Sequence, residues 1–210
     1  MNRTSFVTAA RTAFELASAP EVRGAWREES ACAGMSVGGL AHHLVQQAVN
    51  TVRLLEMEPV AEAPIALLDH YARAAWVSSG PDDEANVTIR EGSDVAAAGG
   101  ADTVLEVAAA ALEALPRALA GHRVPDQVRI PWQGWSLTTP DFLVTRAMEI
   151  VVHSDDLAAS VGLPTPEFPD DVVEAVLGLL TGVAVRRHGQ AAVVRALSRP
   201  QRAPASVSAF

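Results

Sequence analysis

The stretch TPDFLVTRAMEIVVHSDDLAASVG, from Thr139 to Gly162, decides the fold because it carries both ends of one long helix. Thr139 can act as the N-cap, Pro140 suits the first helical turn, and Asp141 places negative charge at the positive end of the helix dipole. Gly162 is the residue type that most often ends a helix. The stretch therefore predicts a single helix.

One face of this predicted helix is polar. Glu149 and His153 are four residues apart, so their side chains project from the same face, which Thr145 and Asp156 share. A carboxylate and an imidazole one turn apart can bind one metal ion. A solvated ion pair has the same spacing, so the helix alone leaves both interpretations open.

Composition narrows the class of protein. The chain has 210 residues, of which 49% are hydrophobic, enough for one domain with a sizeable core. The formal net charge is -9 and the basic residues are dispersed, which argues against a nucleic-acid or acidic membrane surface as partner. There is no lysine, so Schiff-base and P-loop lysine chemistry are excluded, and the arginine bias is typical of a GC-rich genome such as that of an actinobacterium.

The single cysteine, Cys32, rules out an intrachain disulfide and fits a reducing cytosol. We interpret it as a small, partly buried thiol rather than a nucleophile. The N-terminal residues lack the apolar core of a signal peptide, and no apolar run of about 18 residues exists to span a membrane. We therefore expect a cytoplasmic protein.

The rest of the chain is mostly helical in pattern. Apolar spacing predicts further helices over residues 5–27 with a break at Pro20, 36–56, 65–77, 101–120 with a kink at Pro116, and 170–189. Residues 128–132 and 135–138 predict a small hairpin turning at Gln133-Gly134, residues 86–91 an extended piece or loop, and residues 78–83 a break. The fold class is thus all-α, a bundle with long crossover connections, a hairpin before the fourth bundle helix and an extra C-terminal helix. We expect residues 1–190 to form one domain and residues 191–210 to form a tail, either mobile or folded back over the body, with a short helix over residues 190–197.

The helix predicted over residues 36–56 carries two adjacent histidines. His43, Gln47 and Asn50 share one strip beside the apolar stripe, and His42 lies on another side near Arg53. Periodicity does not decide which histidine faces inward.

Two segments carry a resemblance to a known family: LAHHL, residues 40–44, and RAMEIVVHSDDL, residues 146–157. In this order and spacing they resemble the mycothiol-dependent maleylpyruvate isomerase family, which belongs to the DinB-like four-helix bundles. The resemblance implies one divalent metal ion, usually zinc, held by His43, Glu149 and His153, with mycothiol as co-substrate. Two imidazoles and one carboxylate leave a fourth coordination position open, although ligand type alone also suits nickel or iron. Asp156 is then either a hydrogen-bond partner behind a ligand or a salt-bridge partner of Arg146.

The function implied is activation of the thiol for addition or transfer to an electrophilic small molecule. The isomerase carries a C-terminal domain that the residues after Gly189 are too few to form, so we expect thiol transfer rather than cis-trans isomerisation. Contacts to the ligand are expected from Gln47, Asn50, Trp135 and Arg90. Alternatives are a non-catalytic metal-binding stress or interaction protein, and a bundle without an ion. DinB-like bundles often pair, so a homodimer is also expected.

Overall fold

The fold is mostly helical, with one small antiparallel sheet. The computed structural model describes residues 1–78, 80, 82–121 and 123–210. Within these residues the elements are α1 (Arg3–Ala17), α2 (Pro20–Gly24), α3 (Val37–Glu56), α4 (Leu67–Arg73), α5 (Ala75–Ser78), α6 (Glu84–Ala97), α7 (Ala101–Ala120), β1 (Gln127–Ile130), β2 (Trp135–Thr138), α8 (Thr139–Val161), α9 (Asp170–His188), α10 (Gln190–Ser198) and the 3-10 helix η1 (Pro200–Arg202).

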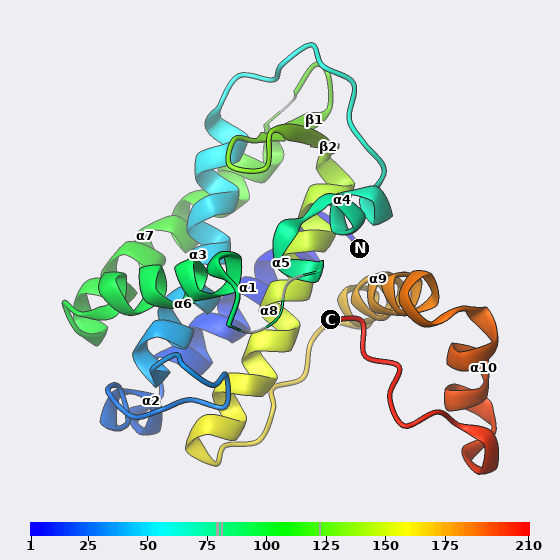
Figure 1. Ribbon diagram of the computed structural model, residues 1–210. Helices are drawn as coiled ribbons and strands as arrows, with labels where there is room; N and C mark the ends of the chain where they lie inside the picture. Colours follow the sequence, from blue (N-terminus) through cyan, green and yellow to red (C-terminus); the bar gives the residue numbers. More distant parts are fainter. Residues whose placement is uncertain (79, 81, 122) are drawn as a thin grey trace.

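Four long helices pack around one core. α3 contacts α1, α7 and α8, and α1 also contacts both α7 and α8 (Figure 1). Their inward faces supply fully buried side chains, among them Phe6, Leu44, Leu115 and Ile150. Burial of this apolar surface is the main force that holds α3 and α8 side by side. These two helices carry the polar residues singled out in the sequence.

The long helix α8 forms as its sequence predicts, but its cap lies one residue earlier. Thr138 is the N-cap, and its hydroxyl accepts a hydrogen bond from the backbone N–H of Asp141 at 3.2 Å. The prediction of Thr139 as cap was wrong because either threonine could serve, and strand β2 keeps Thr138 in the extended conformation that a cap requires. Gly162 ends the helix with a φ of 69°, in the left-handed region that glycine adopts without strain.

The hairpin before α8 is confirmed with different bounds. Gln127 pairs with Thr138, and Ile130 pairs with Trp135. The first strand stops at Ile130 because Pro131 has no N–H to donate. The connection therefore spans residues 131–134 instead of the predicted two-residue turn, and exposes Trp132.

Other helix bounds also differ from the predictions. Residues 86–91 are not extended but lie within α6, because packing against α3 outweighs the weak helix propensity of Val87, Thr88 and Ile89. The helix predicted over 65–77 is split into α4 and α5 at Ala74, whose backbone is extended. Pro20 begins α2, as the predicted break requires, and Pro116 lies inside the continuous helix α7. Within the break predicted over 78–83, residues 79 and 81 lie outside the described residues.

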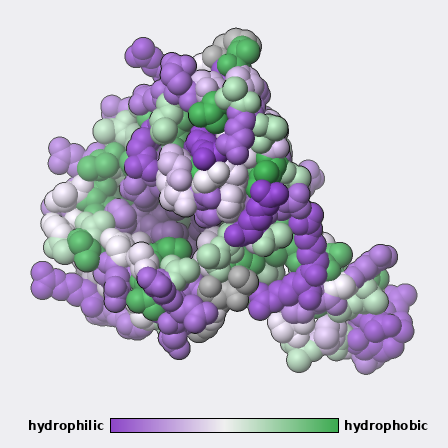
Figure 2. Space-filling model, turned by 45° about the horizontal axis from the view of Figure 1, so that its top comes forward, coloured by the Kyte–Doolittle hydropathy of each residue, from purple (hydrophilic) through white to green (hydrophobic). Residues whose placement is uncertain are grey.

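The C-terminal segment leaves the body and returns to it. α10 and η1 form a lobe that stands out from the body (Figures 1 and 2). After η1 the chain runs back, and Nε2 of His188 lies 2.7 Å from the carbonyl oxygen of Ser208. Phe210 packs on Trp76 with ring centroids 4.9 Å apart. The short helix predicted over residues 190–197 is thus confirmed as α10, and the rest of the tail folds back over the body.

Among the described residues, no single helix combines the length and the apolar character needed to cross a membrane. α6 and α7 meet that criterion only as a pair, and they are bent by 100° relative to each other.

Candidate metal centre

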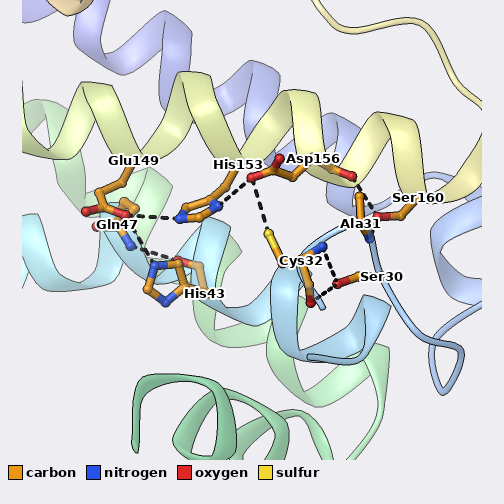
Figure 3. A network of polar contacts seen from close by, with 9 residues as sticks. All are labelled: Ser30, Ala31, Cys32, His43, Gln47, Glu149, His153, Asp156 and Ser160. Atoms are coloured by element: carbon orange, nitrogen blue, oxygen red, sulfur yellow. Dashed lines mark hydrogen bonds and ion pairs between the residues drawn. The ribbon is translucent and has the colours of Figure 1, made fainter. Parts of the chain in front are cut away.

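Three predicted ligands from two helices converge on one point. α3 supplies His43, and α8 supplies Glu149 and His153 (Figure 3). Oε2 of Glu149 lies 3.3 Å from Nε2 of His43 and 3.2 Å from Nε2 of His153. One ligand atom from each residue lies within 4.8 Å of the other two. This separation is small enough for a single cation to bind all three.

The two ring nitrogens of His153 face two different carboxylates, and this arrangement suits a cation. Nδ1 of His153 lies 3.0 Å from Oδ2 of Asp156, while Nε2 faces Glu149. A neutral imidazole has only one N–H, so it can donate to one of these two carboxylates but not to both. If Nδ1–H donates to Asp156, the Nε2 lone pair points at Glu149 and requires either a second proton or a metal ion between them. The donor set therefore fits a divalent metal with N and O ligands.

The pKa shifts of Glu149 and His153 in the protein without a metal also indicate that the cluster needs positive charge beside its carboxylates. Burial opposes ionisation of Glu149, but hydrogen bonds from His153 and His43 outweigh it and hold the pKa of the carboxyl well below its usual range. Burial also opposes protonation of His153, but hydrogen bonds with Asp156, Cys32 and Glu149 raise its pKa well above the ordinary value. In the absence of a metal, a proton on the His153 imidazole thus offsets the charge of the neighbouring carboxylates.

Asp156 contacts His153, and among the described residues no ion pair joins it to Arg146. Oδ2 of Asp156 lies near Nδ1 of His153 and accepts a hydrogen bond from Sγ of Cys32 at 3.3 Å (Figure 3). Burial opposes this charge, yet the contact with His153 outweighs it and lowers the pKa of Asp156. One ligand atom each from Cys32, His153 and Asp156 also lies within 4.8 Å of the other two. The Cys32 thiol therefore lies at the edge of the candidate centre.

A chain of two hydrogen bonds through Gln47 joins Arg146 to the backbone of His43. Nη1 of Arg146 donates to Oε1 of Gln47 at 2.8 Å, and Nε2 of Gln47 donates to the backbone carbonyl of His43 at 2.8 Å. Gln47 is buried, so these bonds fix its amide. This chain of hydrogen bonds ties the α3 backbone at His43 to the α8 helix that carries the other two ligands.

The three predicted ligands lie on the wall of a cavity of about 1100 Å³. Most of its lining is apolar or aromatic, and the charged residues Arg90, Arg186 and Arg187 also border it. Of the expected ligand contacts, only Arg90 lines this cavity. Gln47 lies behind His43, Asn50 accepts a hydrogen bond from Gln46 at 3.4 Å, and Nε1 of Trp135 donates to Nδ1 of His70 at 3.0 Å.

Most residues that line the cavity were not predicted as site residues, among them Cys32, Tyr71, Trp76 and Phe210. Cys32 lies in an irregular segment and Phe210 lies at the far end of the chain, so no helical period relates them to the ligands. A signal did exist for Tyr71, since it is the only tyrosine and lies on a predicted helix.

A model of the family described as mycothiol maleylpyruvate isomerase N-terminal domain matches residues 7–158. Both segments quoted for the resemblance, and all three residues of the cluster, lie within that match. A comparison with curated proteins gave no significant match, and neither did a comparison with solved structures. The family match covers well over half of the 210 residues, so the chain belongs to the family of the mycothiol maleylpyruvate isomerase N-terminal domain.

Proposed function

We propose that this protein is a metal-dependent enzyme that activates a low-molecular-weight thiol, mycothiol, for addition or transfer to an electrophilic small molecule. The observation that carries the proposal is the convergence of His43, Glu149 and His153 on the wall of a large cavity. The packing of α1, α3, α7 and α8 around one core supports a DinB-like four-helix bundle as its scaffold.

The chemistry needs an ionised sulfur. A divalent cation such as zinc, when bound by two imidazoles and one carboxylate, keeps a coordination position open and lowers the pKa of a thiol placed there, so that thiolate exists at neutral pH.

The residues of the chain prepare that position. His43 and His153 present Nε2 atoms, and Glu149 supplies a negative charge that offsets the charge of the cation. Asp156 accepts the Nδ1 proton of His153, which fixes the ring orientation and leaves Nε2 free to act as a ligand. Apolar side chains such as Met148 and Val152 line the adjoining cavity and limit the access of water to the reacting sulfur.

The volume of the cavity supports a reaction between two molecules. About 1100 Å³ exceeds what one drug-sized ligand usually fills. A thiol and an electrophile can therefore bind together, with the sulfur at the metal ligands and the electrophile against the apolar lining.

A matched pair of variants on α3 tests the proposal. The protein is purified without chelator, its bound metal is measured, and loss of mycothiol is followed with monobromobimane as electrophile. His43→Ala should abolish both metal binding and catalysed thiol loss. His42→Ala removes the neighbouring imidazole, which neither lines the cavity nor belongs to the cluster, and should keep both. Metal binding without catalysed thiol loss would instead favour a non-catalytic metal-binding protein.

The family description favours a second candidate, cis-trans isomerisation of the maleylpyruvate type. Thiolate would add to the double bond, the adduct would rotate, and the thiol would leave unchanged. The two reactions are separated by stoichiometry, because transfer consumes one thiol per product and isomerisation consumes none. Incubation with maleylpyruvate and substoichiometric mycothiol decides between them.

A further inference from the structure

Three aromatic side chains form one wall of the cavity. Tyr71, Trp76 and Phe210 contact one another, with ring centroids 6.1 Å apart for Tyr71–Trp76, 5.7 Å for Tyr71–Phe210 and 4.9 Å for Trp76–Phe210. All three line the same cavity as the metal-ligand cluster. We call them the aromatic wall. Its rings offer apolar faces and edges on which another flat ring can stack at similar distances.

The wall contains a buried hydroxyl, that of Tyr71, without a hydrogen-bond partner among the described residues. Tyr71 is 2% exposed, and its oxygen has no hydrogen-bond partner among the described residues. A buried hydroxyl without a partner is destabilising, and most such groups in native proteins are paired. Because Tyr71 borders the cavity, a molecule bound in the cavity is the candidate for the missing acceptor.

The hydroxyl is a donor and not an anion. Burial, together with the negative charge of Glu149, raises the pKa of Tyr71 far above its ordinary value. The phenol therefore keeps its proton at any physiological pH and can donate one hydrogen bond.

From the wall and its unpaired hydroxyl we infer that the cavity holds a subsite for a flat aromatic molecule carrying an acceptor oxygen, such as a carbonyl, that binds the Tyr71 hydroxyl. This inference rests on the proposed function in one respect only, namely that the molecule is the electrophile. Aromatic ketones, quinones and nitroarenes belong to this class.

Two unreactive probes isolate the hydrogen bond. β-Acetylnaphthalene and β-ethylnaphthalene have nearly the same shape, but only the first carries an acceptor oxygen. Their affinities are measured by calorimetry for the native protein and for Tyr71→Phe. The native protein should prefer the acetyl probe, and Tyr71→Phe should weaken that probe by about tenfold while changing the ethyl probe by less than about twofold.

The wall itself is tested by a matched pair of tryptophans. Trp76→Ala should weaken both probes, since it removes a stacking surface. Trp132→Ala removes an exposed tryptophan of the hairpin loop, which does not line the cavity, and should change neither affinity. Equal loss of both probes in Tyr71→Phe would overturn the role of the hydroxyl, and failure of either probe to bind the native protein would overturn the subsite.

An infrared measurement on the native protein removes the dependence on a folded variant. The carbonyl stretch of bound β-acetylnaphthalene should fall below its frequency in hexane, as it does when a carbonyl accepts a hydrogen bond. An unshifted band would contradict the inference. Because neither probe alkylates a thiol and no metal is needed, these outcomes are independent of whether thiol transfer occurs.

Discussion

Nδ1 of His153 lies 3.0 Å from Oδ2 of Asp156, three residues further along α8. The carboxylate thus sits on the far side of the imidazole from Glu149 and the candidate metal position. A partner in this place fixes the protonated nitrogen of a ligating histidine and increases the basicity of the other. If the cluster binds a metal as proposed, Asp156 would control how well His153 binds it without touching the metal itself.

We predict that Asp156→Asn lowers zinc affinity by roughly 10- to 100-fold, because an amide holds the Nδ1 proton more weakly than a carboxylate does. Competition with a chromophoric chelator measures the change. Asp155→Asn is the matched control, since Asp155 is exposed and its carboxylate accepts from the hydroxyl of Thr165 instead. An equal effect of both variants would refute the role of Asp156.

The bond between Gln47 and Arg146 predicts a loss of stability. Gln47→Leu keeps the side-chain volume but leaves Nη1 of the partly buried Arg146 guanidinium without its acceptor. The free energy of unfolding should fall by about 1–3 kcal/mol in urea denaturation. Gln46→Leu, one residue earlier and only partly buried, should stay within about 0.5 kcal/mol of the native protein. Similar values for the two variants would show that the Arg146 bond contributes little.

Two helical glycines should respond to alanine in opposite directions. A Cβ on Gly39 would collide with Oδ1 of Asp94, which accepts hydrogen bonds from the N–H and hydroxyl of Ser36 at the start of α3. Gly39→Ala should therefore destabilise the protein by about 1–3 kcal/mol. Around Gly92 no atom lies within 4 Å of an added Cβ, so Gly92→Ala should stabilise it by about 0.5–1 kcal/mol. Urea unfolding compares the two, and a destabilised Gly92→Ala would count against the packing described for α6.

His70 gives the protein a specific acid sensitivity. Its Nδ1 accepts the Trp135 hydrogen bond, and burial, with a smaller effect from the charge of Arg146, lowers its pKa from 6.5 to about 4. The unfolded chain therefore binds this proton at higher pH than the folded one does. The resulting stability is present above about pH 6.5 and is lost as the pH falls through about 4.

This contribution amounts to about 3 kcal/mol at most, and His70→Gln should remove it, because glutamine can accept from Trp135 but does not titrate. Urea unfolding of metal-free native and variant protein is compared between pH 7 and pH 4, so that the effects of other groups cancel. Parallel curves for the two proteins would rule out His70 as the source.

The sequence predicts the ligand cluster better than it predicts the cavity. Glu149 and His153 are one helical turn apart, so local geometry places them on one face, and the family motif separates His43 from its neighbour His42. The fold class and the long helices follow from apolar spacing and capping signals in the same way. These are properties of short stretches, which a sequence displays directly.

The contacts that the sequence does not predict depend on tertiary packing. Cys32 reaches Asp156 from a segment 124 residues away, and Phe210 reaches Trp76 only because the chain turns back after η1. No local pattern encodes either approach. Tertiary packing also explains why the prediction of an extended piece or loop over residues 86–91 was wrong. These residues lie in α6, which is helical because it packs against α3.

X-ray absorption of the zinc-loaded protein, with and without mycothiol, tests the central claim most directly. We predict a zinc shell of nitrogen and oxygen ligands that includes two imidazoles, from His43 and His153, and that gains one sulfur at about 2.3 Å when mycothiol is added. A shell that stays unchanged on addition of the thiol would contradict thiol activation at this centre. A sulfur already present before the thiol is added would place Cys32 in the coordination shell and contradict the proposed ligand set.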